Sequence, residues 1–201
     1  MPLKIAVCIS GGGSNLLALL ESLRNFGGAK VVLVLSNRAS AGGLVHAKSF
    51  GVPAAVFRNP SDSDEWLGLL RQHHVDLIVL AGYLKLVPPA VIAAYRDRII
   101  NIHPALLPSF GGPGMYGLRV HQAVLASGAK VSGCTVHLVD EAYDRGPLLA
   151  QSRVPVLPGD TAETLAARVL EAEHRLLPAV VRAAAEAGRP IPLPQPVESN
   201  P

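Results

Sequence analysis

Residues 4–23 read KIAVCISGGGSNLLALLESL, and this stretch decides the fold. A short β-rich run ends in three consecutive glycines, and a segment with an apolar stripe at helical spacing follows them directly. A strand, a glycine turn and a helix in this order form the first unit of an α/β sheet. The rest of the chain can then be read for repeats of that unit.

The unit recurs along the first half of the chain. Further strands are expected at 31–35, 54–57, 75–80 and 98–102, and helices at 41–50, 63–72 and 89–95. The expected strands are continuous runs of Val, Ile and Leu without polar alternation, which is typical of a parallel sheet covered on both faces. The first half therefore predicts a doubly wound α/β sheet.

The second half extends this sheet with a helix at 118–127, strands at 132–139 and 148–156, and a long C-terminal helix from 161 to about 187. The sequence Asp160-Thr161-Ala162-Glu163 at the start of that helix is typical of an N-cap. We predict a Rossmann-like, mostly parallel sheet of about seven strands, with the last strand antiparallel. Residues 1–187 are expected to form a single domain, and the proline-rich tail 188–201 to be extended or disordered.

Composition limits the classes of function. With 201 residues, 49% of them hydrophobic, the chain can bury a sizeable core. The net charge of +3 comes from scattered residues and aromatic residues make up only 4%, which disfavours a nucleic-acid surface and favours small anionic ligands. No apolar run reaches the roughly 18 residues of a membrane span, so we expect a cytoplasmic location. Cys8 and Cys134 lie in strand-like runs and are expected to be buried free thiols, and no residues have the spacing of a metal site.

A polar motif follows the apolar residues 99–100 and reads Asn101-Ile102-His103-Pro104-Ala105-Leu106-Leu107-Pro108. Asn101 and His103 are two positions apart on an expected strand, so their side chains should point the same way. The two prolines prevent the strand from continuing, which places the histidine at a strand end beside a loop. An amide and an imidazole held together can bind a developing oxyanion and exchange a proton near neutral pH.

The glycine turn that ends in Gly13-Ser14-Asn15 suits an anion, because free backbone N–H groups and the helix dipole meet there. A tight turn with Ser14 as an ordinary helix cap is the alternative. The turn is a poor dinucleotide fingerprint, since Leu16 stands where a third glycine is needed and no acid follows the second strand. A single monophosphate is the better fit.

Asp144 lies in the loop DEAYDRGP, residues 140–147, together with two other acids. If this loop folds over Asn101 and His103, a nearby carboxylate will favour the protonated imidazole and raise its pKa. Solvation or local turn hydrogen bonding is the alternative for each of the three acids. His137 is expected either to line the site or to be a hydrogen-bonded structural histidine, and His121 is expected at the surface.

Five segments together carry a resemblance to a known family. They read ISGGGSNL at 9–16, SNRA at 36–39, LAGYL at 80–84, NIHPALLP at 101–108 and DRGP at 144–147. In this order they closely resemble the phosphoribosylglycinamide formyltransferase family, over about residues 4–185. The resemblance implies a metal-free enzyme of purine biosynthesis that transfers a formyl group from 10-formyltetrahydrofolate to the amine of glycinamide ribonucleotide.

The resemblance also implies roles for individual residues. The catalytic residues would be Asn101, His103 and Asp144. The ribonucleotide would bind to Gly13, Ser14 and Asn15 through its phosphate and to Glu173 through its glycinamide part. The folate would lie along Leu84, Lys85, Leu86 and Val87 and against Asn101, Val139 and Asp140. Two departures from the family pattern are the lack of a basic folate contact within 59–65 and a longer loop at 110–114.

The mechanism implied by the resemblance has Asn101 and protonated His103 stabilising the formyl oxyanion, while Asp144 keeps His103 protonated. The main alternative is 10-formyltetrahydrofolate hydrolase, which shares the trio but usually carries an extra N-terminal domain, whereas this chain begins at its first strand. The methionyl-tRNA formyltransferases carry a further C-terminal domain. An NADP-binding oxidoreductase would use the glycine turn and Arg38. No nucleic-acid or membrane partner is expected, and the chain is expected to be a monomer or a homodimer.

Overall fold

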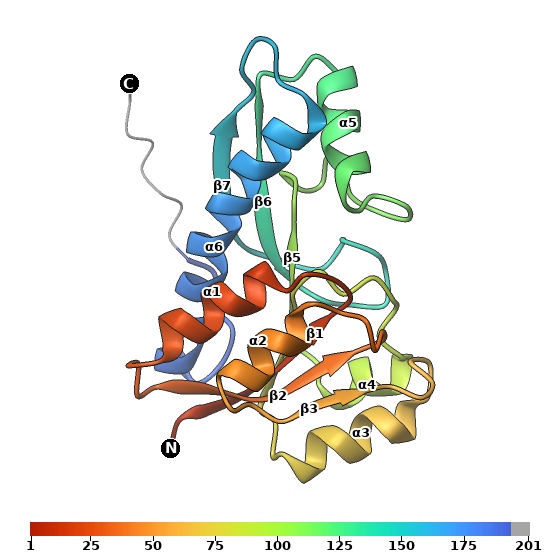
Figure 1. Ribbon diagram of the computed structural model, residues 1–201, viewed down its shortest axis with the longest axis vertical. Coiled ribbons are helices and arrows are strands. Elements are labelled where there is room, and N and C mark those ends of the chain that lie inside the picture. Colours follow the sequence, from red (N-terminus) through yellow and green to blue (C-terminus); the bar gives the residue numbers. More distant parts are fainter. Residues whose placement is uncertain (194–201) are drawn as a thin grey trace.

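The computed structural model describes residues 1–193 and contains one seven-stranded sheet covered by helices (Figure 1). The strands are β1 (Leu3–Ile9), β2 (Ala29–Ser36), β3 (Ala54–Val56), β4 (Leu77–Leu80), β5 (Ile99–His103), β6 (Val131–Leu138) and β7 (Leu148–Pro155). The helices are α1 (Ser14–Leu23), α2 (Gly43–Ser49), α3 (Ser63–Gln72), α4 (Pro89–Ala94), α5 (Leu118–Ala126) and α6 (Ala162–Ala187). Every predicted helix and strand is present, with ends that differ by a few residues, and the α/β class is confirmed.

The sheet is mixed, with the order β3-β2-β1-β4-β5-β6-β7. Neighbouring strands from β3 to β5 pair in parallel, which requires the helical crossovers seen between them. The last strand is antiparallel to its neighbour β6, as predicted, and β6 is also antiparallel to β5. The change from parallel to antiparallel pairing therefore occurs between β5 and β6, one strand earlier than the last strand.

The central strand β1 is buried on both faces, which explains its uninterrupted apolar sequence. Ile5, Val7 and Ile9 pack in one core cluster with α1, α2 and α6. Ala6 and Cys8 point to the other face and pack in a second cluster with α3 and α4. Both cysteines are free and buried, as predicted. In the part of the chain that the structure describes, no helix combines the length and apolarity needed to cross a membrane.

The long helix α6 begins and ends at residues suited to those positions. Thr161 is the N-cap, and its side chain and that of Thr164 form a reciprocal capping box. Gly188 ends the helix at a φ of 72°, a conformation that favours glycine. The chain then returns to the sheet, where Leu193 N donates to Leu149 O at 2.8 Å. The first residues of the predicted tail thus lie against β7, and residues 194–201 lie outside the described part.

The topology also fixes where a ligand can bind. The strand order continues from β1 through β2 on one side and through β4 on the other, so β1 lies at the switch point of the parallel sheet. Open α/β sheets bind ligands in the crevice beyond the carboxyl ends of the strands at such a point. The glycine turn after β1 and His103 at the end of β5 both lie at this edge.

Candidate active site

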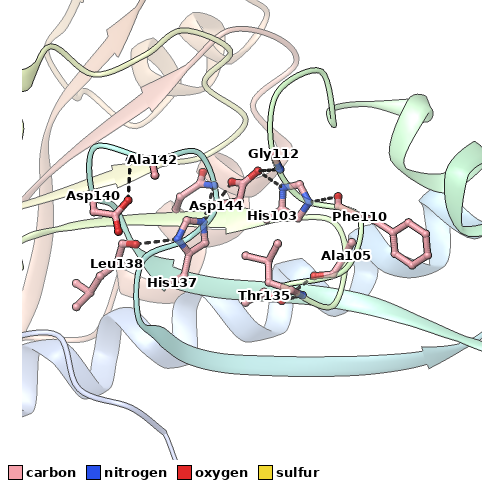
Figure 2. A network of polar contacts seen from close by, with 12 residues as sticks. His103, Ala105, Phe110, Gly112, Thr135, His137, Leu138, Asp140, Ala142 and Asp144 are labelled. Carbon is pink, nitrogen blue, oxygen red and sulfur yellow. Dashed lines mark hydrogen bonds and ion pairs between the residues drawn. The ribbon is translucent and has the colours of Figure 1, made fainter.

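Polar side chains from β5, β6 and the loop after β6 meet at one place, and Figure 2 shows His103, His137 and Asp144 of this group pointing toward one another. The β5–β6 register pairs Asn101 with His137, and Asn101 Nδ2 lies 3.1 Å from His137 Nε2. Asp144 lies between the two histidines, with Oδ2 at 3.6 Å from His103 Nδ1 and Oδ1 at 3.5 Å from His137 Nε2. The structure therefore brings the three predicted catalytic residues together and adds His137 to them.

The hydrogen bonds define where the protons lie on the two imidazoles. His137 Nδ1 is 2.8 Å from the Leu138 carbonyl and His103 Nε2 is 2.9 Å from the Phe110 carbonyl, so each of these nitrogens donates. His137 Nε2 lies between the Asn101 amide, at 3.1 Å, and Asp144 Oδ1, at 3.5 Å. In protonated His103, Nδ1–H faces Asp144. In protonated His103, each ring N–H group therefore faces an acceptor, which is the Phe110 carbonyl at Nε2 and the Asp144 carboxylate at Nδ1.

The pKa of His103 lies below its ordinary value. Burial lowers the pKa, since only 4% of the side chain is exposed, and the opposing effects of Asp144 and the Phe110 carbonyl are smaller. Asp144 does favour the imidazolium, as predicted, but the net pKa lies below its ordinary value. The predicted effect of Asp144 is therefore present, but desolvation of the cation outweighs the attraction of one carboxylate.

Asp144 itself is held as a carboxylate. Burial raises its pKa, but contacts with His137 and the Gly112 amide and the charge of His103 together bring the pKa below its ordinary value. The Gly112 N–H donates to Asp144 Oδ2 at 2.9 Å. At neutral pH the site therefore combines a negative Asp144 with a His103 whose protonation is suppressed by burial.

The segment Phe110–Gly112 contacts both members of the His103–Asp144 pair. Its first carbonyl accepts from His103 and its last amide donates to Asp144. Gly112 has a φ of 99°, and Phe110 has the unusual φ of 56° for a residue with a side chain. This segment belongs to the loop 110–114 that departs from the family pattern, and Figure 2 shows it joined to His103 through Phe110 and to Asp144 through Gly112.

A cavity of about 260 Å³ lies beside the cluster, and most of the predicted binding residues line it. Its lining includes Asn15, Leu84, Lys85, Leu86, Val87, Asn101, His103, Val139, Asp140, Asp144 and Glu173, together with His137. Gly13 and Ser14 are the predicted residues that do not line it. They lie next to Asn15 at the start of α1, so the glycine turn adjoins the cavity.

The glycine turn is shaped by close approach to α2. Gly13 is the N-cap of α1 with a φ of 77°, and a Cβ atom built there would lie 2.5 Å from the Gly43 Cα atom. Ser14 is the first helical residue, and within residues 1–193 no side chain caps this helix. The alternative that Ser14 is an ordinary cap was therefore wrong. The first N–H groups of α1 have no acceptor within the helix, as an anion site requires.

At the same end of the cavity, α6 supplies a buried acid. Asn15 Nδ2 donates to Glu173 Oε2 at 2.6 Å, which connects α1 to a residue 158 positions later. Burial raises the pKa of Glu173 to about 7, and the hydrogen bond from Asn15 opposes that shift. Glu173 can therefore carry a proton near neutral pH, which a surface glutamate cannot.

The contacts of Thr135 with the chain after His103 were not predicted from the sequence. Thr135 is fully buried, and its hydroxyl donates to the Ala105 carbonyl at 2.6 Å and accepts from Leu107 N at 3.1 Å, which fixes the chain after His103. The prediction for His121 was wrong, because this histidine is 4% exposed and packs on the inner side of α5. Its position between Val120 and Val124 gave a signal of helix periodicity that points to the core.

Comparison with known families adds a direct assignment. Residues 3–181 match the formyl transferase family. The chain belongs to the formyl transferase family. Over residues 1–193 no group of three or more His, Cys, Asp or Glu side chains could hold a metal ion.

Individual formyl transferases show how far the similarity extends. A chloroplastic phosphoribosylglycinamide formyltransferase of Arabidopsis thaliana is 49% identical over 91% of this chain and 65% of that protein, so the chain spans just under two thirds of this plant relative. A solved phosphoribosylglycinamide formyltransferase from Brucella melitensis has 47% identity and a TM-score of 0.84, over 92% of this chain and 96% of that one. The corresponding structure from Anaplasma phagocytophilum has 41% identity and a TM-score of 0.87, over 93% of this chain and 88% of that one. A formyltetrahydrofolate deformylase from Pseudomonas syringae has 26% identity and a TM-score of 0.83, over 93% of this chain and 62% of that one.

Proposed function

We propose that this formyl transferase moves the formyl group of 10-formyltetrahydrofolate to the amine of glycinamide ribonucleotide. The observation that carries the proposal is the cluster of Asn101, His103, His137 and Asp144 beside a cavity with two chemically different ends. One end is the largely apolar wall 84–87, and the other is the Asn15–Glu173 pair beside the glycine turn. Two ligands, one flat and apolar and one anionic, can therefore meet at the cluster.

The ribonucleotide fits the end formed by α1 and α6. Its phosphate would accept hydrogen bonds from the free N–H groups at Gly13–Asn15, where the helix dipole favours negative charge. Its glycinamide amine would lie near Glu173, whose carboxyl is buried and titrates near neutral pH. A carboxylate beside the amine would orient it and accept its hydrogen bond.

The folate fits the wall Leu84–Val87. Leu84 and Leu86 are exposed large apolar side chains at the cavity, and covering them with a ring system would remove them from water. Val139 and Asp140 line the same cavity from the loop after β6. Lys85, also in the wall, offers a cation for the carboxylates at the far end of a folate.

The reaction would proceed by direct attack of the amine on the formyl carbon. A C–N bond forms, the formyl oxygen becomes an oxyanion, and the bond from carbon to the folate nitrogen then breaks while a proton passes from the amine to that nitrogen. Asn101 Nδ2 and His103 Nε2 are the donors for the oxyanion, the latter once it exchanges the Phe110 carbonyl for the formyl oxygen. Asp144 stabilises the imidazolium that this requires.

A formyl-transfer assay tests the proposal. The purified chain is given 10-formyltetrahydrofolate, and release of tetrahydrofolate is followed by absorbance with and without glycinamide ribonucleotide. We expect turnover that depends on the ribonucleotide and a formylated ribonucleotide as product. Equal folate release without the acceptor would identify a hydrolase instead, and no release under either condition would contradict both activities.

A further inference from the structure

Ser10 is a buried hydroxyl that the reaction does not use. It follows β1 directly, at the switch point of the sheet, and only 2% of it is exposed. Its Oγ donates to Asn37 Oδ1 at 2.6 Å and accepts from Leu84 N at 2.8 Å. One hydroxyl thus joins the ends of β1 and β2 to the segment that leaves β4.

The contact with Leu84 occurs where the backbone ladder ends. Ala81 N still donates to Cys8 O at 2.9 Å, so β1 and β4 remain paired up to that residue. The chain then turns at Gly82, which has a φ of 74°. Two residues later the Leu84 N–H points back to Ser10 instead of to a strand. The hydroxyl therefore replaces a missing backbone acceptor at the start of the wall 84–87.

A second contact holds the residue that directly precedes the wall 84–87. The ring of Tyr83, which is 8% exposed, lies edge-on to Trp66 with their centroids 5.7 Å apart, and Trp66 stacks on Phe57 at 4.4 Å. This ring cluster holds Tyr83, while Ser10 holds the next peptide. Without the Ser10 hydroxyl the ring cluster would still anchor the segment, but the direction of the wall beyond Tyr83 would be free to change.

Ser10 is also the residue before the glycine turn. Gly11 O accepts from Gly43 N at 3.1 Å, so the turn is tied to α2 one residue after Ser10 is tied to Leu84. We propose that Ser10 is a positioning residue for formyl transfer, which sets the wall for the formyl donor against the turn that binds the anionic acceptor. This inference rests on the proposed function.

The substitution Ser10→Ala tests the inference. Because it removes a hydrogen bond that places the wall and leaves Asn101, His103 and Asp144 untouched, we expect KM for 10-formyltetrahydrofolate to rise about 3- to 10-fold. The ribonucleotide KM should rise less, and kcat should change by less than about 2-fold. Trp66 is the one tryptophan of the chain and lies edge-on to Tyr83. Because the ring cluster still holds Tyr83 in this variant, Trp66 emission should stay as in wild type, which shows that the fold is intact.

Ser132→Ala is the matched control. Ser132 is also 2% exposed, but its Oγ has no hydrogen-bond partner among the described residues. This variant should keep the wild-type KM values and Trp66 emission. If Ser10→Ala unfolds, Ser10→Cys keeps a side chain of similar size with a weaker donor and acceptor, and it should raise the donor KM by a smaller factor.

An unchanged donor KM in the folded Ser10 variants, or an equal rise in Ser132→Ala, would refute the role of Ser10. A loss of kcat with unchanged KM values would also contradict it. Failure of the proposed function is a separate outcome, because it would appear as absent turnover in the wild-type chain.

Discussion

The carboxylate of Asp144 can be removed with little change in shape by the substitution Asp144→Asn. The new amide oxygen can still accept from Gly112 N, so the loop over the site should keep its conformation. What is lost is a negative charge 3.6 Å from His103 Nδ1. Coulomb's law gives about 1 kcal/mol for two unit charges at that distance in water and about 5 kcal/mol at an effective dielectric constant of 20.

Burial places the true value in the upper part of that interval, because the two side chains are 4% and 11% exposed. At 1.36 kcal/mol per factor of ten, the protonated fraction of His103 falls by about 7-fold at the low end and about 2,000-fold at the high end. We therefore expect kcat at neutral pH to fall at least about 100-fold, within the range for lost acid–base assistance. KM values for both substrates should change much less.

The pH profile gives the decisive measurement. The protonated form of His103 is the active one in the proposed mechanism, so kcat decreases as the pH rises through the His103 pKa. Removing Asp144 lowers that pKa further, and the decrease should occur at lower pH in the variant. Glu141→Gln, which removes an exposed charge three residues earlier, is the control and should behave as wild type. A variant with kcat within 10-fold of wild type and an unshifted profile would refute the role assigned to Asp144.

Three further predictions concern the binding end of the cavity and the covering loop. Ser14→Asp places a carboxylate at the anion site and should raise the ribonucleotide KM sharply with little effect on the donor KM, as steady-state kinetics will show. Gly112→Ala is strained at a φ of 99° and should lower kcat by moving the amide that holds Asp144, whereas Gly159→Ala, at a φ of 82° in a distant turn, should affect only thermal stability. Glu173 has a folded-state pKa of about 7, above its unfolded value, so its contribution to stability is present at low pH and is lost as the pH rises through 7. In Glu173→Gln the free energy of unfolding, from denaturant titrations at pH 5 and 8, should decline less between the two pH values than in wild type.

The order of helices and strands could be predicted from the sequence because local patterns specify it. The buried strand at Ile5–Ile9 is apolar without alternation, and the cap at Thr161 has its own signature. Strand direction is not a local property, and the sequence of β6 does not show that the strand runs antiparallel to β5. That reversal is what pairs His137 with Asn101, so the role of His137 stayed undecided at the level of sequence.

The site could be predicted only in part for a similar reason. Residue types and spacing brought Asn101 and His103 together on one strand, and resemblance to a family added Asp144. The direction of the His103 pKa depends on the balance between burial and one charge, and burial is a property of the whole fold. The contact of Ser10 with Leu84 joins residues 74 positions apart, and no periodicity in either segment indicates it.

The contact between Asn15 and Glu173 has a consequence for the order in which the cavity is completed during translation of the chain. The two residues are separated by 158 positions, and α6 begins only at Ala162, near the end of the chain. At about 5–20 residues per second, roughly 8–30 seconds pass on the ribosome between completion of β1 and the first turn of α6. Until α6 is synthesised, the glycine turn and later also β5 exist without Glu173, the buried acid beside Asn15. The nascent chain therefore acquires the Asn15–Glu173 end of the cavity last, as a late step of synthesis rather than with the strand that carries His103.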